Sequence, residues 1–491
     1  MNNIEQAITQ VIEENNLSSL WNEGVCRELD KLNLNLNFSD KRKDLTKVPF
    51  VTIDGSDAKD FDDAIHCIES QSSYILSVAI ADVAGLVKTK SALDKEAMHR
   101  GTSIYFPSKV IPMLPEKISN DLCSLVPNKD RNTVVCEMTI SFSGNIESYK
   151  FLEARINSHK RMTYDEVNLI VKNSSGINKK IGYSLVALSK LTRILLRKRQ
   201  ERKALEIEAQ EPSLKINKLG DVDKIDLPKR LFSHQMVEES MLAANVCAAN
   251  FMHKHYKSGI YRIHEEPEEI KLDSLKNFFS IKGFSKKFGN NSLDVLEQCL
   301  QFARSKDLNK SLQTIVLQSL KRAEYSTLEK GHFGLQLDRY SHFTSPIRRY
   351  PDLMVHRLIK DVIHGNKSEF NKDEMEEICN ELSEAERIAE RSSRQVTQQM
   401  ICYFLKQFIG NEYHSVVTGV TDFGLFCEID DFFVSGLLHV SDLPGDRYYF
   451  DREVNVLRGK KNGRQYKLGQ KILVTIANVS PEERKITLVP K

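Results

Sequence analysis

Hydrophobic residues recur at two different spacings in the first third of the chain. Residues 1–47 begin with apolar side chains on one face of a helix and become irregular before the basic run KRK at 41–43. From 48 to about 157, runs such as YILSVAIADVAGLV and TVVCEMTISFSGNI have the apolar density of a buried sheet, with a short helix predicted between them at 93–100. The pattern therefore predicts a helical connector followed by a sheet.

Beyond residue 165 the pattern becomes helical. Over 165–203 a stripe of leucine and isoleucine side chains recurs at helical spacing, which is typical of a face packed on a core. A sheet wrapped by helices is the simplest architecture for residues 48–405, so the predicted fold class is α+β. Further helical blocks are predicted at 230–256, 272–279, 293–320, 354–362 and 373–408.

Residues 406–491 alternate between short strands and turns. Segments such as EYHSVVTGVTDFGLFCEI, SGLLHVSDL and KILVTIANVS amount to about five strands in about eighty residues, which predicts a small closed barrel. The insert at 452–471 has few acids and suits a loop that follows phosphates, although composition alone suits a solvated loop equally well. Its basic residues include Arg458, Lys460, Lys461, Arg464 and Lys467.

Composition describes an ordinary globular protein. The 491 residues are 41% hydrophobic and 28% charged, and 70 Lys plus Arg against 67 Asp plus Glu give a net charge of only +3. Any basic surface for nucleic acid must therefore be local. The nine cysteines include no CxxC pair and indicate reduced thiols, and no apolar run approaches the ~20 residues of a membrane span. We therefore expect a cytoplasmic protein without a membrane span.

The strongest chemical signal is the acidic segment VTIDGSDAKDFDDA at 51–64, which follows a strand-like run. Carboxylates held this close repel one another unless a cation lies among them. Hard oxygen ligands suit Mg²⁺ or Mn²⁺ rather than zinc, so the segment indicates a metal-dependent phosphoryl-transfer site. Composition alone leaves a solvated acidic turn open, whereas the EF-hand pattern of Gly and Glu is absent. The carboxylates are Asp54, Asp57, Asp60, Asp62 and Asp63.

Several long motifs occur in an order that resembles one known family. TIDGSDAKDFDDA, VAIADVAGLV, RGTSIYFPSKVIPMLPEKISNDLCSL and HFTSPIRRYPDL resemble the catalytic domain of the ribonuclease II and ribonuclease R (RNB) family, closer to the ribonuclease R branch. The resemblance implies a mixed-sheet RNB domain at 48–405 and an S1-type OB-fold barrel at 406–491. It also implies that residues 1–47 are the connector that follows two cold-shock domains in longer members, and we expect those domains to be absent here.

By this resemblance the chain is expected to be an Mg²⁺-dependent hydrolytic exoribonuclease. It would degrade single-stranded RNA from the 3′ end and release 5′-mononucleotides, with Mn²⁺ as a substitute ion. The implied metal ligands are Asp54, Asp60, Asp62 and Asp63. Of these, Asp62 is assigned to the second ion or to orienting the attacking water, whereas Asp57 is treated as structural.

The resemblance also implies roles for cationic and aromatic side chains. Arg348 matches the catalytic arginine, whose planar fork suits a phosphate, and Arg349 is a candidate RNA contact. The residues alone equally allow both arginines to pair with the acidic loop as a structural network. Tyr105 and Tyr164 fall on RNA-stacking positions, with Tyr164 near the scissile nucleotide and counted as catalytic, and Glu390 falls near the 3′ end.

Two further features of the resemblance concern the edges of the RNA path. Phe423, Phe426 and His439 are expected on the RNA-binding face of the barrel, although Phe426 taken alone also fits a core position. Ile207 stands where relatives carry an aromatic side chain that stacks on the terminal base. We therefore expect one wall of this clamp to be aliphatic and the limit product to differ in length.

Other functions remain open from the sequence. A non-catalytic RNA-binding protein could keep this fold, and the same metals could serve an endonuclease or a DNA-directed enzyme. We expect a monomer whose partner is single-stranded RNA; the sequence names no protein partner.

Overall fold

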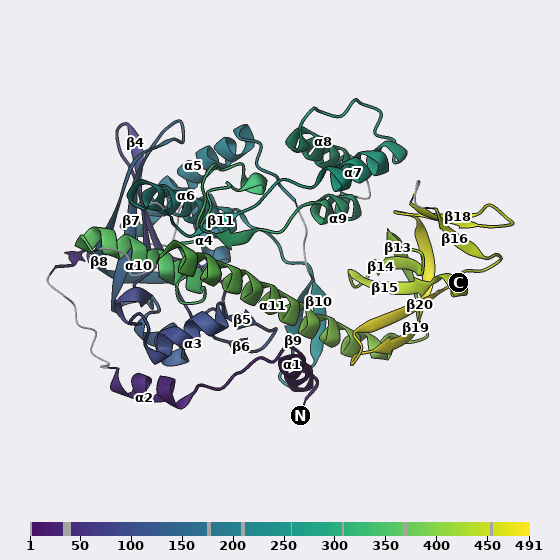
Figure 1. Cartoon of the computed structure of the whole chain (residues 1–491), viewed down its shortest axis with the longest axis horizontal. Coiled ribbons are helices and arrows are strands. Elements are labelled where there is room, and N and C mark those ends of the chain that lie inside the picture. Colours follow the sequence, from purple (N-terminus) through teal and green to yellow (C-terminus); the bar gives the residue numbers. More distant parts are fainter. Residues whose placement is uncertain are drawn as a thin grey trace.

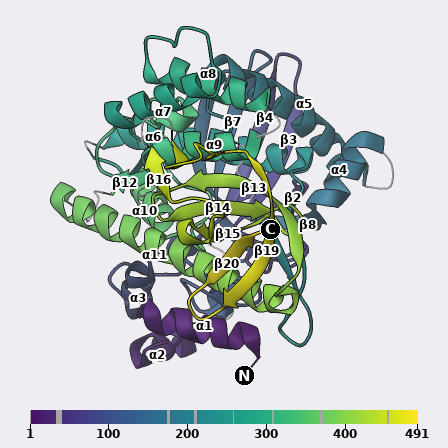
Figure 2. The same cartoon turned by 90° about the vertical axis from the view of Figure 1, so that its right-hand side faces the viewer.

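The structure, a computed structural model, consists of a large helix-covered body and a small barrel joined by one long helix (Figure 1). Turning the molecule brings the barrel in front of the larger body (Figure 2). The structure describes residues 2–32, 41–173, 178–207, 212–256, 258–306, 309–366, 371–451 and 455–491.

The sheet of the larger body closes on itself because its last strand is long. The first part of β8 pairs antiparallel with β7, and its final residues pair parallel with β2. The spatial order is β1-β8-β2-β3-β4-β7, which confirms a mixed sheet in an α+β fold. The strands are β1 (Lys43–Asp44), β2 (Phe50–Asp54), β3 (Asp63–Glu69), β4 (Ser73–Ala81), β7 (Asp130–Ser141) and β8 (Ile146–Thr163).

Helices pack on this sheet and share one hydrophobic core with it. The leucine stripe predicted to be core is buried at Leu185, Leu188 and Leu191, and α5 packs against β3. The helical block predicted at 165–203 forms two helices, α4 and α5. The helices are α3 (Ala92–Arg100), α4 (Tyr164–Asn173), α5 (Lys179–Glu201), α6 (Phe232–His255) and α10 (Tyr350–His364).

One helix lies where the sequence predicted irregular chain, so that prediction is wrong. The Asn22 side chain accepts the Val25 N–H at 3.0 Å and caps α2 (Glu23–Lys31). Val25 is the one residue of this helix that is buried. A single buried side chain leaves no apolar stripe that periodicity could detect.

A separate helical cluster stands beside the sheet domain. Phe278 and Phe279 belong to its own hydrophobic core, which also includes Leu468 of the C-terminal region. The block predicted at 293–320 forms two helices rather than one. The cluster consists of α7 (Glu269–Ile281), α8 (Ser292–Arg304) and α9 (Asn309–Ser319).

The long helix α11 (Lys372–Leu405) runs from the sheet domain to the barrel (Figure 1). The N-terminal helix α1 (Asn3–Glu14) packs along it with its predicted apolar face, and both share a core with the barrel. Short strand pairs complete the larger body: β5 (Ile104–Tyr105) with β6 (Val110–Ile111), β9 (Ser213–Ile216) with β10 (Val222–Asp226), and β11 (Tyr261–Ile263) with β12 (Glu324–Ser326).

The C-terminal region is a closed five-stranded barrel, as predicted, in the order β13-β14-β15-β20-β19. These strands are β13 (Glu412–Val420), β14 (Gly424–Ile429), β15 (Val434–His439), β19 (Lys471–Ser480) and β20 (Lys485–Pro490). A side sheet of β16 (Tyr448–Asp451), β17 (Val456–Gly459) and β18 (Gln465–Lys467) carries the basic insert, whose first residue Arg452 lies outside the described residues. In the part of the chain that is described, no helix is long and apolar enough to cross a membrane.

Candidate active site

The acidic loop begins where two parallel strands end. Asp54 is the last residue of β2 and lies opposite Thr163, the last residue of β8. Because parallel strands end at the same edge of a sheet, Tyr164, the first residue of α4, is brought beside the start of the acidic loop. After the loop, Asp63 opens β3 and pairs with Ile80 of β4. Both ends of the loop are thus fixed to the sheet.

The loop between Asp54 and Asp63 is held by side chains from elsewhere in the domain. Arg161 donates to the carbonyl oxygens of Gly55 and Ser56 at 3.0 and 2.6 Å. Ser124 accepts the Phe61 N–H at 3.0 Å and donates to the Lys59 carbonyl at 2.8 Å. These bonds preorganise the loop. Asp57 is exposed, and its structural role stays a prediction.

Asp62 is the most deeply placed carboxylate of the loop, with 4% of its surface exposed. Its Oδ1 accepts the Ile347 N–H at 2.8 Å, and its Oδ2 lies 3.6 Å from Nε of Arg348. Oδ2 is buried and has no hydrogen-bond partner within the described residues. Asp62 therefore connects the acidic loop to the SPIRRY segment at 345–350 while one of its oxygens makes no hydrogen bond.

The acidic loop carries more negative charge than its surroundings neutralise. Burial raises the pKa of Asp62 well above its ordinary value, and the nearby Arg348 only partly opposes this. Burial and the Asp60 carboxylate raise the pKa of Asp54, and burial with the Asp54 carboxylate raises that of Asp63. Such shifts mark a site that favours a bound proton or a bound cation.

The donor set suits a divalent ion whose shell is completed by other ligands. Among the described residues, no group of three or more His, Cys, Asp or Glu side chains is arranged to hold a metal ion. However, Oδ2 of Asp54 and Oδ2 of Asp62 are both buried without a hydrogen-bond partner. Mg²⁺ typically takes one or two carboxylates together with waters and substrate phosphates, so these orphaned oxygens fit it.

The two arginines of the SPIRRY segment have different environments. Arg348 is 46% exposed and reaches toward Asp62, and it also donates to Ser345 Oγ at 3.2 Å. Arg349 instead pairs with Asp352 at 2.7 Å, and Asp352 also accepts the Ser345 N–H. Arg348 is thus available to a phosphate, whereas Arg349 braces the start of α10, and its role as an RNA contact stays a prediction.

Tyr105 and Tyr164 both lie at the acidic loop. Tyr105 donates its hydroxyl to Asp60 Oδ2 at 2.6 Å, and burial, followed by the Asp60 carboxylate, raises its pKa. Burial and the carboxylates of Asp54 and Asp63 raise the pKa of Tyr164 to about 12. Both phenols therefore stay protonated at neutral pH and can donate hydrogen bonds or stack.

The remaining predicted residues lie farther along the molecule. Glu390 lines a cavity between α11 and the barrel. Ile207 is half-buried and packs against the core of α7, α8 and α9. Phe423 and Phe426 are 45% and 37% exposed with ring centroids 5.9 Å apart, which fits a binding face rather than a core.

The register of the barrel places His439 beside these aromatic rings. His439 is exposed and pairs with Gly424, two residues before Phe426 on β14. Residues two apart on a strand face the same side, so His439 shares the exposed face with Phe426. In the basic insert, Arg458 pairs with Asp451 at 3.5 Å. The exposed cations there include Lys460, Lys461, Arg464 and Lys467.

Sequence reasoning missed two residues that hold the site. Arg161 anchors the acidic loop, and the imidazole of His234 stacks on Tyr164 with ring centroids 3.9 Å apart and planes at 16°. The one local signal was that Arg161 immediately precedes Met162, Thr163 and Tyr164. His234 lies on α6 and could be placed only by the tertiary fold.

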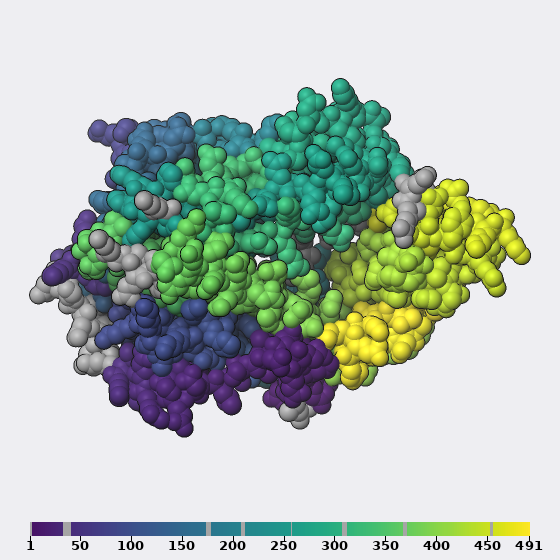
Figure 3. All heavy atoms as spheres, viewed as in Figure 1, coloured from purple at the N-terminus to yellow at the C-terminus, as the bar shows by residue number. Residues whose placement is uncertain are grey.

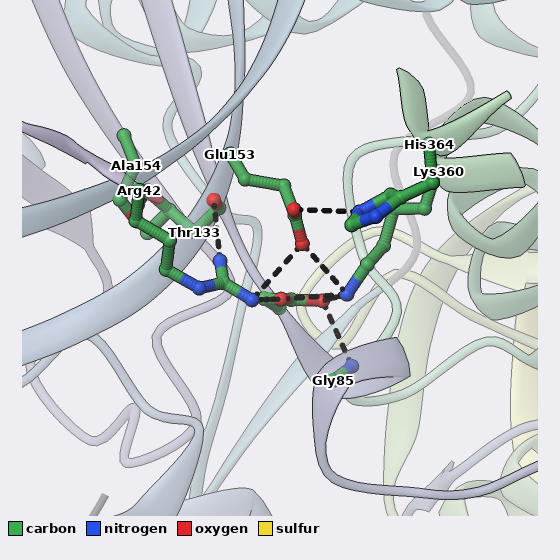
Figure 4. A network of polar contacts seen from close by, with 8 residues as sticks. Arg42, Gly85, Thr133, Glu153, Ala154, Lys360 and His364 are labelled. Atoms are coloured by element: carbon green, nitrogen blue, oxygen red, sulfur yellow. Dashed lines mark hydrogen bonds and ion pairs between the residues drawn. The ribbon is translucent and has the colours of Figure 1, made fainter. Parts of the chain in front are cut away.

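A second cluster of buried carboxylates lies in the same domain (Figure 4). Arg42 and Lys360 each contact both Asp82 and Glu153, and His364 contacts Glu153 at 2.8 Å. Although burial alone would raise it, Lys360 and Arg42 lower the pKa of Asp82 to about 2. This cluster is a neutralised network and leaves no role for a further cation.

The fold and the site define a class: an α+β domain with an uncompensated acidic centre facing an arginine, followed by an OB-type barrel. Residues 42–365 match the RNB domain, and residues 406–489 match the S1 RNA binding domain. The chain therefore belongs to the RNB domain family, which confirms the resemblance. The finer limits predicted for the domains, 48–405 and 406–491, stay predictions.

Individual relatives agree with this assignment. Ribonuclease R of Escherichia coli (strain K12) is 40% identical over 462 residues, which cover 91% of this chain and 57% of that protein. The chain thus spans little more than half the length of this relative. The structure of Mycoplasma genitalium RNase R in complex with ribose methylated single-stranded RNA has a TM-score of 0.94 at 29% identity, covering 100% of this chain and 78% of that one.

The same fold also occurs in a protein described as a pseudonuclease. Yeast Ssd1 has a TM-score of 0.76 at 18% identity, covering 98% of this chain and 60% of that one. At this identity the likeness concerns the fold alone. Activity must therefore be argued from the residues of the site.

Proposed function

We propose that this protein is an Mg²⁺-dependent hydrolytic exoribonuclease that degrades single-stranded RNA from 3′ to 5′ and releases 5′-mononucleotides. The single observation that carries the proposal is that Asp54 Oδ2 and Asp62 Oδ2 are buried without a hydrogen bond within the described residues, with the exposed Arg348 3.6 Å from Asp62 Oδ2. The relatives named Ribonuclease R support the reaction class.

The carboxylates would hold the ions. Asp54 and Asp62 offer free oxygens, Asp63 lies in the same electrostatic cluster, and Asp60 would join once Tyr105 releases it. Bound Mg²⁺, or Mn²⁺ in its place, would supply Lewis acidity and a more acidic water. Fixing the loop through Arg161 keeps the ligands in place without reorganisation.

The remaining side chains bind and orient RNA. Arg348 is exposed, unlike Arg349, and its planar fork suits the non-bridging oxygens of a phosphate. Tyr164, held in plane by His234, lies where its hydroxyl can contact a ribose beside the acidic loop. Tyr105, whose hydroxyl donates to Asp60, offers a stacking plane, and stacking on bases is tolerant of sequence.

The substrate class follows from the two bodies together. The barrel matches an S1 RNA binding domain, and its exposed Phe423, Phe426 and His439 suit bases of a single strand. The M. genitalium relative was solved with single-stranded RNA, which supports the same partner here. The monomeric state and the cytoplasmic location stay predictions.

Cleavage of defined nucleic acids tests the proposal. Linear RNA should shorten from its 3′ end, whereas a circular RNA and an all-deoxy oligonucleotide should be cut far more slowly. Asp62→Asn serves as the matched inactive variant because an asparagine oxygen can still accept the Ile347 N–H. Equal cleavage of the circular RNA would establish an endonuclease, and equal cleavage of DNA would remove the RNA specificity.

A non-catalytic RNA-binding protein is the competing function. It predicts that wild type and Asp62→Asn bind RNA equally and that neither shortens it. The presence of all four carboxylates together with Arg348 argues against it.

A further inference from the structure

The helix α1 bridges the long helix α11 and the barrel. Its buried face joins side chains of α11 and of the barrel in one hydrophobic core, and this burial stabilises its docking. The space-filling view shows the N-terminal segment, in purple, against the yellow C-terminal strands of the barrel (Figure 3). The buried side chains of α1 are Ile4, Ala7, Ile8 and Val11.

Two polar side chains of α1 contact the turn between β19 and β20. Gln10 donates its side-chain amide to the Glu482 carbonyl at 3.1 Å. Glu14 forms an ion pair with Arg484, whose side chain is only 14% exposed. Gln10 also donates to the Glu14 carboxylate at 2.7 Å and so helps to fix it beside the barrel.

The same helix is also fixed to the larger body. Gln399 of α11 donates to the Gln10 side-chain oxygen at 2.7 Å, so Gln10 contacts the barrel and α11 at once. Asn15, which ends α1, donates to Gln395 of α11 at 2.8 Å. Near the other end of the helix, Asn3 donates to the turn between β9 and β10.

The chain enters the barrel through the segment at 406–411, directly after α11. A domain joined in this way moves relative to its neighbour unless further contacts hold it. Leu468, directly after β18, supplies one such contact because it packs in the core of α7, α8 and α9. The strands β19 and β20 lie on the side of α1 (Figure 1), so α1 supplies a second attachment there.

We propose that α1 positions the barrel relative to the acidic loop, with Gln10 and Glu14 as its positioning residues, so that one RNA strand can occupy both sites. The inference rests on the proposed function. A barrel already held in place loses little further freedom when RNA binds, so its affinity adds to that of the catalytic end. A barrel released from α1 would lose part of this gain, and only RNA long enough to reach the barrel would be affected.

The distance between the larger body and the barrel tests the positioning directly. One spin label would be placed on Cys26, the exposed cysteine of α2, which packs on α3 of the larger body. The other would be placed at Asp431→Cys, in the exposed turn between β14 and β15. Glu14→Arg or Arg484→Glu alone should broaden the distance distribution. The two substitutions together restore an ion pair and should narrow the distribution again.

Glu13→Arg is the matched control for Glu14→Arg. Glu13 is exposed on the same helix and, within the described part of the chain, makes no ion pair. The same change of charge at this position should leave the distance distribution of the wild type. The inference is overturned if Glu14→Arg behaves like Glu13→Arg, or if the exchanged pair fails to restore the distribution.

Equilibrium binding by the Asp62→Asn protein, which is expected to leave RNA intact, measures the consequence for RNA. Ile8→Ser changes no charge and removes a buried contact of α1, and thermal unfolding checks that the protein stays folded. An RNA long enough to reach the barrel should bind roughly 3- to 10-fold more weakly. A short RNA confined to the catalytic end should keep its affinity.

Glu14→Arg, compared with Glu13→Arg, gives the same comparison of long and short RNA without removing a core contact. Equal loss of affinity for both RNAs, or no loss for either, would overturn the role of α1 alone. Failure of the wild type to bind or cleave any RNA would instead overturn the proposed function.

Discussion

Two clusters of carboxylates in the same domain have opposite electrostatics. In the acidic loop, burial raises the pKa of Asp62, and its Oδ2 makes no hydrogen bond and lies 3.6 Å from Nε of Arg348. Asp82, which pairs with Arg42 and Lys360, is as deeply buried as Asp62, but these two cations lower its pKa to about 2. Burial is common to both, so the difference lies in the cations that the fold supplies.

This difference separates a structural cluster from a ligand site. Burying a carboxylate is costly unless a cation and hydrogen bonds compensate it. The domain supplies two cations to Asp82 and Glu153, whereas it leaves the acidic loop with Arg348 and the loop anchor Arg161. On the proposed function, the acidic loop would therefore gain stability from a bound cation, whereas the network around Asp82 would not.

Removing one carboxylate from each cluster should have opposite consequences, and the largest effect is expected on catalysis. Asp62→Asn should slow RNA cleavage by at least about 10³-fold, because several transition-state contacts depend on this centre. The free energy of unfolding should stay equal or rise, since a buried charge is removed. Single-turnover cleavage and urea unfolding measure both. A variant that keeps full activity would contradict the role given to Asp62.

Asp82→Asn should have its main effect on stability. Removing this carboxylate leaves Lys360 and Arg42 without one of their buried partners, which typically costs about 3–5 kcal/mol. Urea unfolding at neutral pH measures the loss, with Asp62→Asn as the comparison. If both variants were equally stable, the two clusters would not differ in the way described.

Divalent ions should stabilise the protein through one cluster only. Mg²⁺ at 100 times its dissociation constant should raise the free energy of unfolding by about 2.7 kcal/mol, because the ion binds only the folded state. Asp62→Asn should lose this response, whereas Glu153→Gln, altered in the neutralised network, should retain it. Thermal unfolding with Mg²⁺ or with EDTA gives the comparison. A response that survives Asp62→Asn would place the ion elsewhere.

The pH dependence of stability should come from the neutralised network and is the smallest effect. The folded-state pKa of Asp82 is lowered to about 2, below an unfolded value of about 3.9. Its contribution is therefore full above about pH 5 and is lost as the pH falls through about 2, amounting to roughly 2.6 kcal/mol. The stability difference between wild type and Asp82→Asn should shrink as the pH is lowered over this range. A difference independent of pH would show that Asp82 is not held by charge.

Local patterns allowed much of this architecture to be predicted. The strand ending at Asp54, the acidic loop and the alternating barrel strands all follow from neighbours in the sequence. The helix α2 was missed because Val25 alone is buried and the cap at Asn22 gives little signal. Residue type and spacing were thus sufficient wherever the determining contacts are local.

The electrostatic contrast could not be predicted because its contacts are distant in sequence. Arg42 and Lys360 meet at Asp82 from 40 and 278 residues away. The parallel pairing of β2 with β8 likewise brings Tyr164 beside Asp54, and α6 then supplies His234. Which acidic cluster is neutralised depends on these long-range contacts. The five aspartates within residues 51–64 do not by themselves indicate which cations will lie beside them.

The most direct test of the central claim is cleavage of 5′-labelled single-stranded RNA by protein freed of metal with EDTA, followed by addition of Mg²⁺. We predict intact RNA before the addition, and afterwards a ladder that shortens one nucleotide at a time from the 3′ end to a short limit product. Cleavage that proceeds in EDTA, or RNA that remains intact and bound after Mg²⁺ is added, would contradict the account.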